Sequence, residues 1–283
     1  MKNIKYFFQF LVIIIFFVIF KFLGLKNSTL LSGKIFKIIG PLFRSNSICH
    51  KNLILALPNL NLNQRNEIIK KMWFNYGSIF AEYVFISKIK VSKNIEVENQ
   101  NILDECKKNS EPVIFISGHF NNFELMAMHI NSSGIDLSAI YRPLNNIFLN
   151  PIMEYIRKKY ICEKQVKKGF SGSKQILKNF KNGSSIALMI DQRVSEGIKA
   201  KFFQKQALTT TIPAQFVKKF NAKIVPIYIQ RTETNKFKLI VYEPLKFEKN
   251  NSLEIITSKL NEVLEQMILK NPDQWIWTHN RWK

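Results

Sequence analysis

The strongest signal for chemistry in the chain is the segment GHFNNFE at 118–124, in which His119 precedes Glu124 by five positions. On one continuous helix this spacing would rotate the two side chains by about 140° and separate them by about 7.5 Å along the axis. They can meet only if His119 lies in a turn and Glu124 in the first turn of the following helix. One glycine and two asparagines suit such a turn, since glycine adopts backbone angles closed to other residues and asparagine favours helix starts.

A carboxylate that holds one imidazole nitrogen leaves the other nitrogen free to accept a proton from a substrate. This predicts His119 as a general base oriented by Glu124, with a nucleophile supplied by the substrate. A structural role is the alternative, because a histidine near a strand end is commonly a structural hydrogen-bonding residue and this spacing also arises by chance. The motif alone leaves both interpretations open.

The elements that would position this motif form a repeating pattern between residues 112 and 242. Short apolar runs alternate there with stretches of helical length, a pattern that predicts an α/β fold with a mostly parallel mixed sheet flanked by helices. The runs are Val113–Ser117, Leu137–Tyr141, Ser185–Ile190 and Lys223–Ile229, and the helical stretches are 123–130, 152–160, 173–180 and 213–220. Lys236–Tyr242 follows the last run after a polar turn and is expected to pair with it as a hairpin. Amphipathic helices are also expected at 63–80 and at 253–267, the second one capped by Asn251.

Polar groups follow the first three apolar runs: Gly118-His119, Tyr141-Arg142-Pro143 and Asp191-Gln192-Arg193. In open α/β sheets, ligands gather at the carboxyl ends of the strands, so parallel strands would bring these groups to one edge. We therefore expect Arg142, Gln192 and Asn122 to bind substrate.

Asp191 directly follows an apolar run, and a carboxylate at a buried strand end needs a partner. Arg157 and Arg193 are the candidates. We expect a salt bridge that shapes the cleft. Arg157 also begins the run RKK, which could be a solvated helix face, and Arg142 could simply brace its turn.

The N-terminal segment has the composition and length of a membrane-spanning helix. Tyr6–Leu25 is almost unbroken in its apolar character, with basic residues on both sides, and as a helix it would reach about 30 Å, the thickness of a bilayer's hydrocarbon core. A cleaved signal peptide is the alternative. The length of the apolar run and the lack of a small-x-small cleavage site favour an uncleaved anchor. We expect residues 1–26 to form a transmembrane helix and residues 27–283 one domain held at the membrane.

The charge balance restricts the partners. The chain of 283 residues has 42 Lys and Arg against 20 Asp and Glu, a formal net charge of +22. Such an excess suits nucleic acid, an anionic membrane, a phosphorylated lipid or an acidic carrier protein, although a biased genome composition also produces lysine-rich chains. With an anchor present, each basic residue near an anionic leaflet gains about 1 kcal/mol, which favours the membrane over nucleic acid.

The remaining composition excludes several classes of protein. Apolar residues make up 46% of the chain, enough for a large core, which excludes a disordered protein. The three cysteines are far apart, and neither a metal-binding spacing nor a phosphate-binding glycine motif occurs. We expect no metal and no cofactor.

In their order along the chain, these features resemble the bacterial lipid A late acyltransferases, lauroyl and myristoyl transferases that belong to the wider H-x4-D/E acyltransferases. The resemblance is carried by the anchor, GHFNNFE, YRP at 141–143, Arg157, DQR at 191–193, KFFQKQALTTTIPAQ at 201–215, KIVPIYIQR at 223–231 and the C-terminal PDQWIWTHNRWK. The chain departs from the family at Asn121, Asn122 and Phe123, where Gly and Asn-Trp are common, and at Gln204, where a Gly commonly follows the FF pair.

The resemblance implies an activity. His119 would be the general base and Glu124 its orienting partner, while Arg157 and Asp191 match further charged positions of the family's active site. The acyl donor would be a thioester on acyl carrier protein, and the acceptor a hydroxyl on a lipid A precursor. Arg157, Arg142 or backbone N–H groups near the turn could stabilise the oxyanion. The enzyme would lie at the cell inner membrane with its catalytic domain on the cytoplasmic side.

Two other functions stay open. The first is the same chemistry on a different acceptor, a glycerophospholipid or another glycolipid. The second is a non-enzymatic, membrane-tethered basic module that binds lipid or nucleic acid. The tryptophans at 275, 277 and 282 could belong to the core or to the membrane interface.

Overall fold

A seven-stranded sheet forms the centre of the computed structural model, which describes residues 2–283. Its strand order is β1-β9-β8-β2-β5-β3-β4. The strands are β1 (Ile95–Glu98), β2 (Ile114–Ser117), β3 (Leu137–Tyr141), β4 (Lys164–Lys167), β5 (Ser185–Met189), β8 (Ile224–Glu233) and β9 (Lys236–Val241). All neighbours pair in parallel except β8 and β9, which form an antiparallel hairpin. The predicted mostly parallel mixed sheet and its hairpin are thus confirmed.

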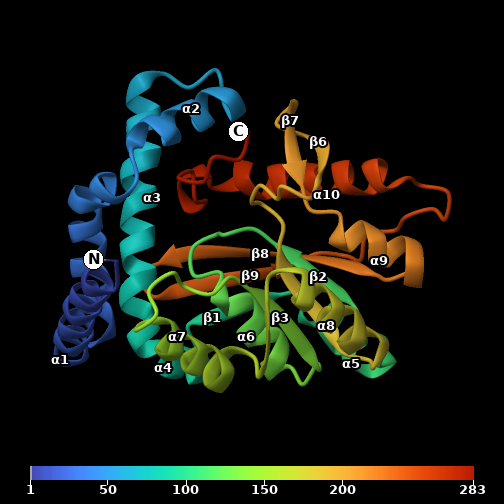
Figure 1. The fold of residues 1–283 in the computed structure, drawn as a ribbon, viewed down its shortest axis with the longest axis horizontal. Coiled ribbons are helices and arrows are strands. Elements are labelled where there is room, and N and C mark those ends of the chain that lie inside the picture. The colour runs from blue at the N-terminus through green and yellow to red at the C-terminus, as the bar shows by residue number, and fades with distance from the viewer. Residues whose placement is uncertain (1) are drawn as a thin grey trace.

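Helices cover both faces of the sheet. On one side, α5 (Gln100–Asn109) and α6 (Glu124–Ser132) are joined by a hydrogen bond from side chain to side chain, and α7 (Asn150–Ile156) continues into the π-helical turn η2 (Arg157–Ile161) next to α6. On the other side, α8 (Phe170–Lys181), α9 (Ile212–Phe220) and α10 (Leu253–Lys270) contact one another in sequence. Figure 1 shows α9 and α10 across the sheet from α5 and α6. This division follows from right-handed crossovers, because connections in opposite directions place their helices on opposite faces.

Several predicted elements are present with small shifts of their ends. The four apolar runs are β2, β3, β5 and β8, and the helical stretches are α6, α7 with η2, α8 and α9. The cap of α10 differs from the expectation, since the side chain of Ser252, rather than that of Asn251, accepts the N–H of Ile255. Short or polar elements did not stand out in the sequence: α2 (Asn46–Ala56), α4 (Ile86–Val91), α5, β1, β4 and the hairpin β6 (Ile198–Phe202) and β7 (Lys205–Thr209).

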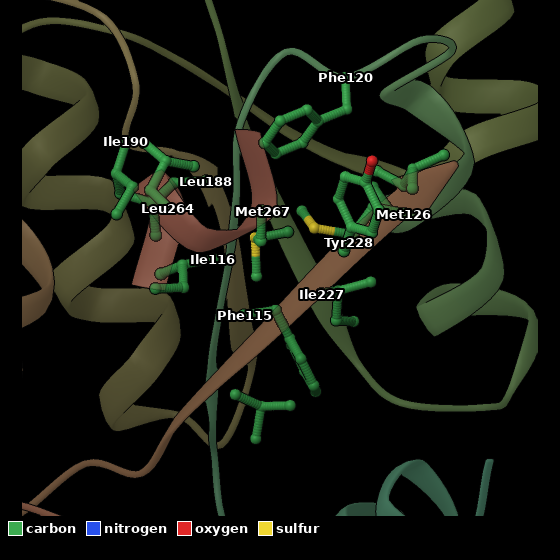
Figure 2. Close-up of a cluster of buried hydrophobic side chains, with 14 of the residues drawn as sticks. Phe115, Ile116, Phe120, Met126, Leu188, Ile190, Ile227, Tyr228, Leu264 and Met267 are labelled. Carbon is green, nitrogen blue, oxygen red and sulfur yellow. The ribbon is translucent and has the colours of Figure 1, made fainter. Parts of the chain in front are cut away.

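The core between the sheet and α10 is apolar and closely packed. Figure 2 shows Leu264 and Met267 of α10 beside side chains of β2, β5 and β8. The ring of Phe120, just after β2, lies edge-on to Tyr228 with 5.0 Å between centroids. This packing holds the chain that carries His119 against the end of the sheet.

A helical pair closes the sheet on the side where β8 ends. In Figure 1, α3 (Leu62–Glu82) stands beside the arrowhead of β8, and α1 (Lys2–Phe43) lies outside α3. The two backbones approach closely, because a Cβ atom on Gly77 would clash with the carbonyl oxygen of Ser32. Gly24 interrupts α1 with a left-handed φ of 75°, which divides the helix into two segments.

The C-terminal segment belongs to the core. Trp275 and Trp277 are 1% and 0% exposed, and the indole of Trp282 donates to the carbonyl oxygen of Phe202. Of the two alternatives for these tryptophans, the core is therefore confirmed.

Gln204 lies in the turn of the β6–β7 hairpin with φ 59°, a conformation in which glycine is least strained, which explains the family's preference at this position.

Candidate active site

Strand register brings His119 and Asp191 together. β2 and β5 are parallel neighbours in which Ser117 pairs with Met189. His119 and Asp191 each lie two residues beyond these paired positions, at the carboxyl edge of the sheet. The turn after β2 and the turn after β5 therefore present an imidazole and a carboxylate side by side.

The two side chains form a hydrogen-bonded dyad. Nδ1 of His119 lies 2.7 Å from Oδ1 of Asp191. The other carboxylate oxygen, Oδ2, accepts the backbone N–H of His119 and the indole N–H of Trp275, both at 2.8 Å. Within residues 2–283, Nε2 of His119 makes no hydrogen bond, and the side chain is 20% exposed. The dyad thus fixes one ring nitrogen and leaves the other for a substrate.

The electrostatics of the dyad suit a base. Burial opposes the charged imidazole, but the charge and hydrogen bond of Asp191, aided by the charge of Glu124, outweigh it and raise the pKa of His119. Burial likewise opposes the charged form of Asp191, yet His119 and the hydrogen bonds from His119 and Trp275 lower the pKa of this carboxyl to about 2. Asp191 therefore stays ionised at neutral pH and stabilises the protonated form of the imidazole, which makes His119 a stronger base.

Glu124 does not take the place expected for it. The expectation that it orients the imidazole is wrong, because Asp191 occupies Nδ1 and the Glu124 carboxylate bonds elsewhere. Its Oε1 lies 2.6 Å from Nη2 of Arg157, accepts Nε of Arg157 at 2.8 Å, and accepts the hydroxyl of Tyr83 at 2.6 Å. The expectation that Arg157 or Arg193 pairs with Asp191 is wrong for the same reason.

Glu124, Arg157 and Tyr83 form a second buried cluster beside the dyad. The side chains of Arg157 and Glu124 are only 11% and 9% exposed. Burial and the neighbouring Glu124 charge raise the pKa of Tyr83, while the attraction of Glu124 outweighs burial and raises the pKa of Arg157. Tyr83 gave no sequence signal, because it lies at the end of α3, 41 positions before Glu124. The cluster ties α3, α6 and η2 together behind the base.

Replacing Glu124 by Gln is expected to act mainly on the free energy of unfolding and less on the rate of acyl transfer. It would leave the buried Arg157 charge without its partner, at a cost of about 3 kcal/mol in the free energy of unfolding. Acyl transfer should fall less than in His119→Ala. Urea unfolding and initial rates measure the two effects, with the exposed Glu67→Gln as matched control. Loss of transfer equal to or greater than that of His119→Ala would contradict a supporting role.

A buried network of hydrogen bonds and one ion pair holds the turn between β2 and α6. Asn121 adopts a left-handed φ of 41°, and its backbone N–H donates to the carbonyl oxygen of Gln274 at 3.0 Å. The amide of Asn122 donates to Oε2 of Glu82 at 3.1 Å, and Glu82 also pairs with Arg231 at 2.5 Å. Asn122 is 2% exposed, so the structure gives it a structural position instead of the substrate contact we expected.

The other predicted substrate-binding residues lie at the open side of the edge. Arg142, directly after β3, is exposed, and Gln192, directly after Asp191, is half-buried.

The ring of Phe123 stands edge-on to His119 with 4.7 Å between centroids, so this departure from the family lies against the base. His279 accepts the backbone N–H of Arg193 at 2.8 Å, and burial lowers its pKa to about 4, which makes it a neutral structural group.

A hollow of about 690 Å³ lies at the opposite end of the strands. Its lining includes Val113 and Lys223, which immediately precede β2 and β8, together with Cys106. It is therefore at the amino ends of these strands, away from the dyad. Within residues 2–283 no three His, Cys, Asp or Glu side chains come together in a group that could hold a metal ion.

Comparisons with known proteins identify the family of the chain. The family model described as bacterial lipid A biosynthesis acyltransferase matches residues 1–283. The chain is 23% identical to the lipid A biosynthesis lauroyltransferase of Escherichia coli K12, over 85% of this chain and 79% of that protein. It is 22% identical to the palmitoleoyltransferase and 21% identical to the myristoyltransferase of the same organism, over 85% and 80% of this chain and 79% and 71% of those proteins. Because the family match extends over the whole chain, this protein belongs to the bacterial lipid A biosynthesis acyltransferase family and is an acyltransferase of lipid A biosynthesis.

Proposed function

We propose that this enzyme transfers a fatty acyl chain from the thioester of acyl carrier protein to a hydroxyl of a lipid A precursor, with His119 as general base. The observation that carries the proposal is the dyad, in which Asp191 holds Nδ1 of His119 and leaves Nε2 unbonded within residues 2–283. A hydroxyl is a poor nucleophile at neutral pH and needs a base to remove its proton as it attacks.

The proposed reaction has two steps. Nε2 of His119 accepts the proton of the acceptor hydroxyl as its oxygen forms a bond to the thioester carbon, which gives a tetrahedral oxyanion. The oxyanion then collapses, the carbon–sulfur bond breaks, and the departing thiolate takes the proton back from the imidazolium. Asp191, with its pKa of about 2, stabilises the imidazolium between the two steps.

The charged groups around the site have separate roles in this proposal. Arg157 is held by Glu124 and Tyr83, so it supports the site through its fixed positive charge and does not move to the substrate. Arg142 and Gln192 are accessible at the edge and would contact the acceptor, whose phosphates an arginine binds well. The net charge of +22 would attract both the acidic carrier protein and the phosphorylated lipid.

The membrane location is part of the proposal. Among residues 2–283, one helix, α1, is long and apolar enough in composition to serve as a membrane anchor. We place the enzyme at the cell inner membrane with its catalytic domain on the cytoplasmic side, where acyl carrier protein is found. A lipid acceptor would then reach the site without leaving the membrane.

An acceptor assay tests the proposal. The purified full-length enzyme is given an acyl-carrier thioester and either a tetraacylated lipid A precursor or a lysophospholipid. We expect transfer to the lipid A precursor, detected by mass spectrometry as one added acyl chain. Transfer to the lysophospholipid alone would overturn the proposed acceptor, and an acyl-coenzyme A control would show whether the carrier protein is required.

A further inference from the structure

The first segment of α1 lies against the domain along one stripe. Five of its less exposed positions recur at spacings of three and four, as expected for one face of a helix: Tyr6, Phe10, Ile13, Phe17 and Phe20. Ile14 and Phe16, which are also half-buried, flank this face. The other positions of this segment are mostly exposed. One face is therefore covered by protein from the beginning of the helix almost to the kink at Gly24.

The loop between β3 and α7 holds the beginning of the helix. The amide of Asn146 donates to the carbonyl oxygen of Tyr6 at 2.8 Å. The ring of Phe148 lies 5.5 Å from that of Phe7 and 6.0 Å from that of Phe10. Asn146 is buried in this contact.

The end of α3 holds the other end of the segment. The ring of Phe80 lies 5.3 Å from that of Phe17 and 5.9 Å from that of Phe20. Phe20 is 1% exposed and packs in one cluster with Ala81 and Phe85. The domain thus grips the helix at two separate places.

These contacts are far apart along the helix axis. Tyr6 and Phe20 are fourteen residues apart, a rise of about 21 Å in a hydrocarbon core of about 30 Å. If this segment crossed the bilayer upright, the domain would have to follow it for most of that depth. The loop between β3 and α7 begins with the exposed Arg142, and the exposed Lys88 lies on α4, just past the end of α3. An upright helix would bring both charged side chains toward the hydrocarbon core, where they are energetically costly.

The surface left uncovered is apolar and continuous with the loop. Exposed apolar side chains occupy the outer face of the helix: Ile4, Phe8, Leu11, Val12, Ile15, Val18, Ile19 and Phe22. Beside the Phe148 contact, Leu144 and Ile147 of the loop are 40% and 54% exposed. Lysines flank the segment at both ends. With protein on one face and exposed apolar side chains on the other, the segment can lie along a membrane interface, where its flanking lysines meet anionic headgroups.

We propose that residues 2–23 lie in the plane of the membrane interface, with the domain on one face and lipid on the other, and that Leu144 and Ile147 enter the same lipid layer. The protein is then monotopic, in place of the single-pass span predicted from the sequence, and its partner is an anionic lipid surface. The inference deepens the proposed function and rests on its membrane location. The loop begins at Arg142, directly after β3, so this placement brings the carboxyl edge of the sheet to the level of the lipid headgroups.

The topology is tested by labelling both ends of the segment. Asn3→Cys and Asn27→Cys, each an exposed position, are made singly in the full-length Cys106→Ser chain, whose other cysteines are buried. Inner-membrane vesicles of either orientation are treated with a membrane-impermeant maleimide. We expect both positions to react from the same side of the membrane. Reaction from opposite sides would overturn the proposal, and would leave the acyl transfer of the same variants as an independent test of the function.

The loop is tested in proteoliposomes of phosphatidylethanolamine with a minor share of phosphatidylglycerol. Ile147→Cys in the same background carries a polarity-sensitive fluorophore, and Ile255→Cys on α10, 56% exposed in the native chain, is the matched control. We expect lipid-borne quenchers to reduce the emission at position 147 several-fold more than at position 255. If lipid-borne quenchers reduced the emission at positions 147 and 255 equally, and aqueous quenchers did the same, the loop would lie outside the membrane and this part of the proposal would be wrong.

Discussion

Replacing His119 by alanine is expected to abolish measurable acyl transfer while the protein remains folded and membrane-bound. General bases of this kind contribute about 10² to 10⁴ in rate, and the imidazole is also the group that protonates the departing thiolate in the proposed reaction. Removing the imidazole takes one partner from the buried Asp191 and lowers stability, but the backbone N–H of residue 119 and the indole of Trp275 still donate to this carboxylate, so the variant should remain folded. Initial rates with acyl-carrier thioester and lipid A precursor measure the effect.

A second histidine of the neighbouring helix is the matched control. His129 lies on α6, and its Nε2 is hydrogen-bonded to Gln100 on the side of the sheet away from α10. His129→Ala should retain transfer within a few-fold of the wild type, and both variants should pellet with membranes and unfold cooperatively in urea. Full activity in His119→Ala would show that another group removes the proton, and would overturn the base assignment.

The fold was predictable where hydrophobic patterning is strong. The four apolar runs became β2, β3, β5 and β8 because fully buried parallel strands need continuous apolar sequence. β1 and β4 are short, alternating and partly exposed, as the pattern of β4, KQVK, shows with one buried residue, Val166. Such strands are specified by the neighbours that they pair with, and these neighbours are known only from the tertiary structure.

The candidate site was predictable in its members but not in their pairing. His119, Glu124, Arg157 and Asp191 do gather at the carboxyl edge, as parallel strands require. The pairing follows from register, since β2 and β5 are offset by 72 positions, which is also the separation of His119 and Asp191. The spacing of five residues within GHFNNFE drew attention to the wrong carboxylate, because a local motif contains no information about the neighbouring strand.

Sequence analysis left Trp275 open between the core and the membrane interface and assigned it no contact in the site. Its indole N–H completes the hydrogen bonds of Asp191 Oδ2, and its backbone forms a bridge with Phe120 in the turn that carries the base. The C-terminal segment therefore positions the dyad, although it is more than 80 residues from Asp191 and more than 150 from His119. An aromatic side chain with one polar atom can serve the core and the site together, which composition alone does not distinguish.

Replacing Asp191 by asparagine is expected to lower acyl transfer by about 10³ to 10⁴, far more than Glu124→Gln. The backbone N–H of His119 and the indole of Trp275 would continue to donate to the Asn oxygen, which turns the new NH₂ group toward Nδ1. An NH₂ group at that position favours the tautomer with the proton on Nε2, so the nitrogen that faces the substrate could no longer accept one.

The pH dependence separates this effect from a general loss of structure. In the native enzyme the charge of Asp191 raises the pKa of His119, so transfer should rise with pH through a limb above the ordinary histidine value of about 6.5. Without that charge, burial dominates and the pKa falls, so the residual activity of Asp191→Asn should have its limb at lower pH. The limb of Glu124→Gln should move in the same direction by a smaller amount, because Glu124 adds only its charge at a distance. An unshifted limb in Asp191→Asn would mean that His119 is not the group that titrates, and the dyad would lose its role as the base.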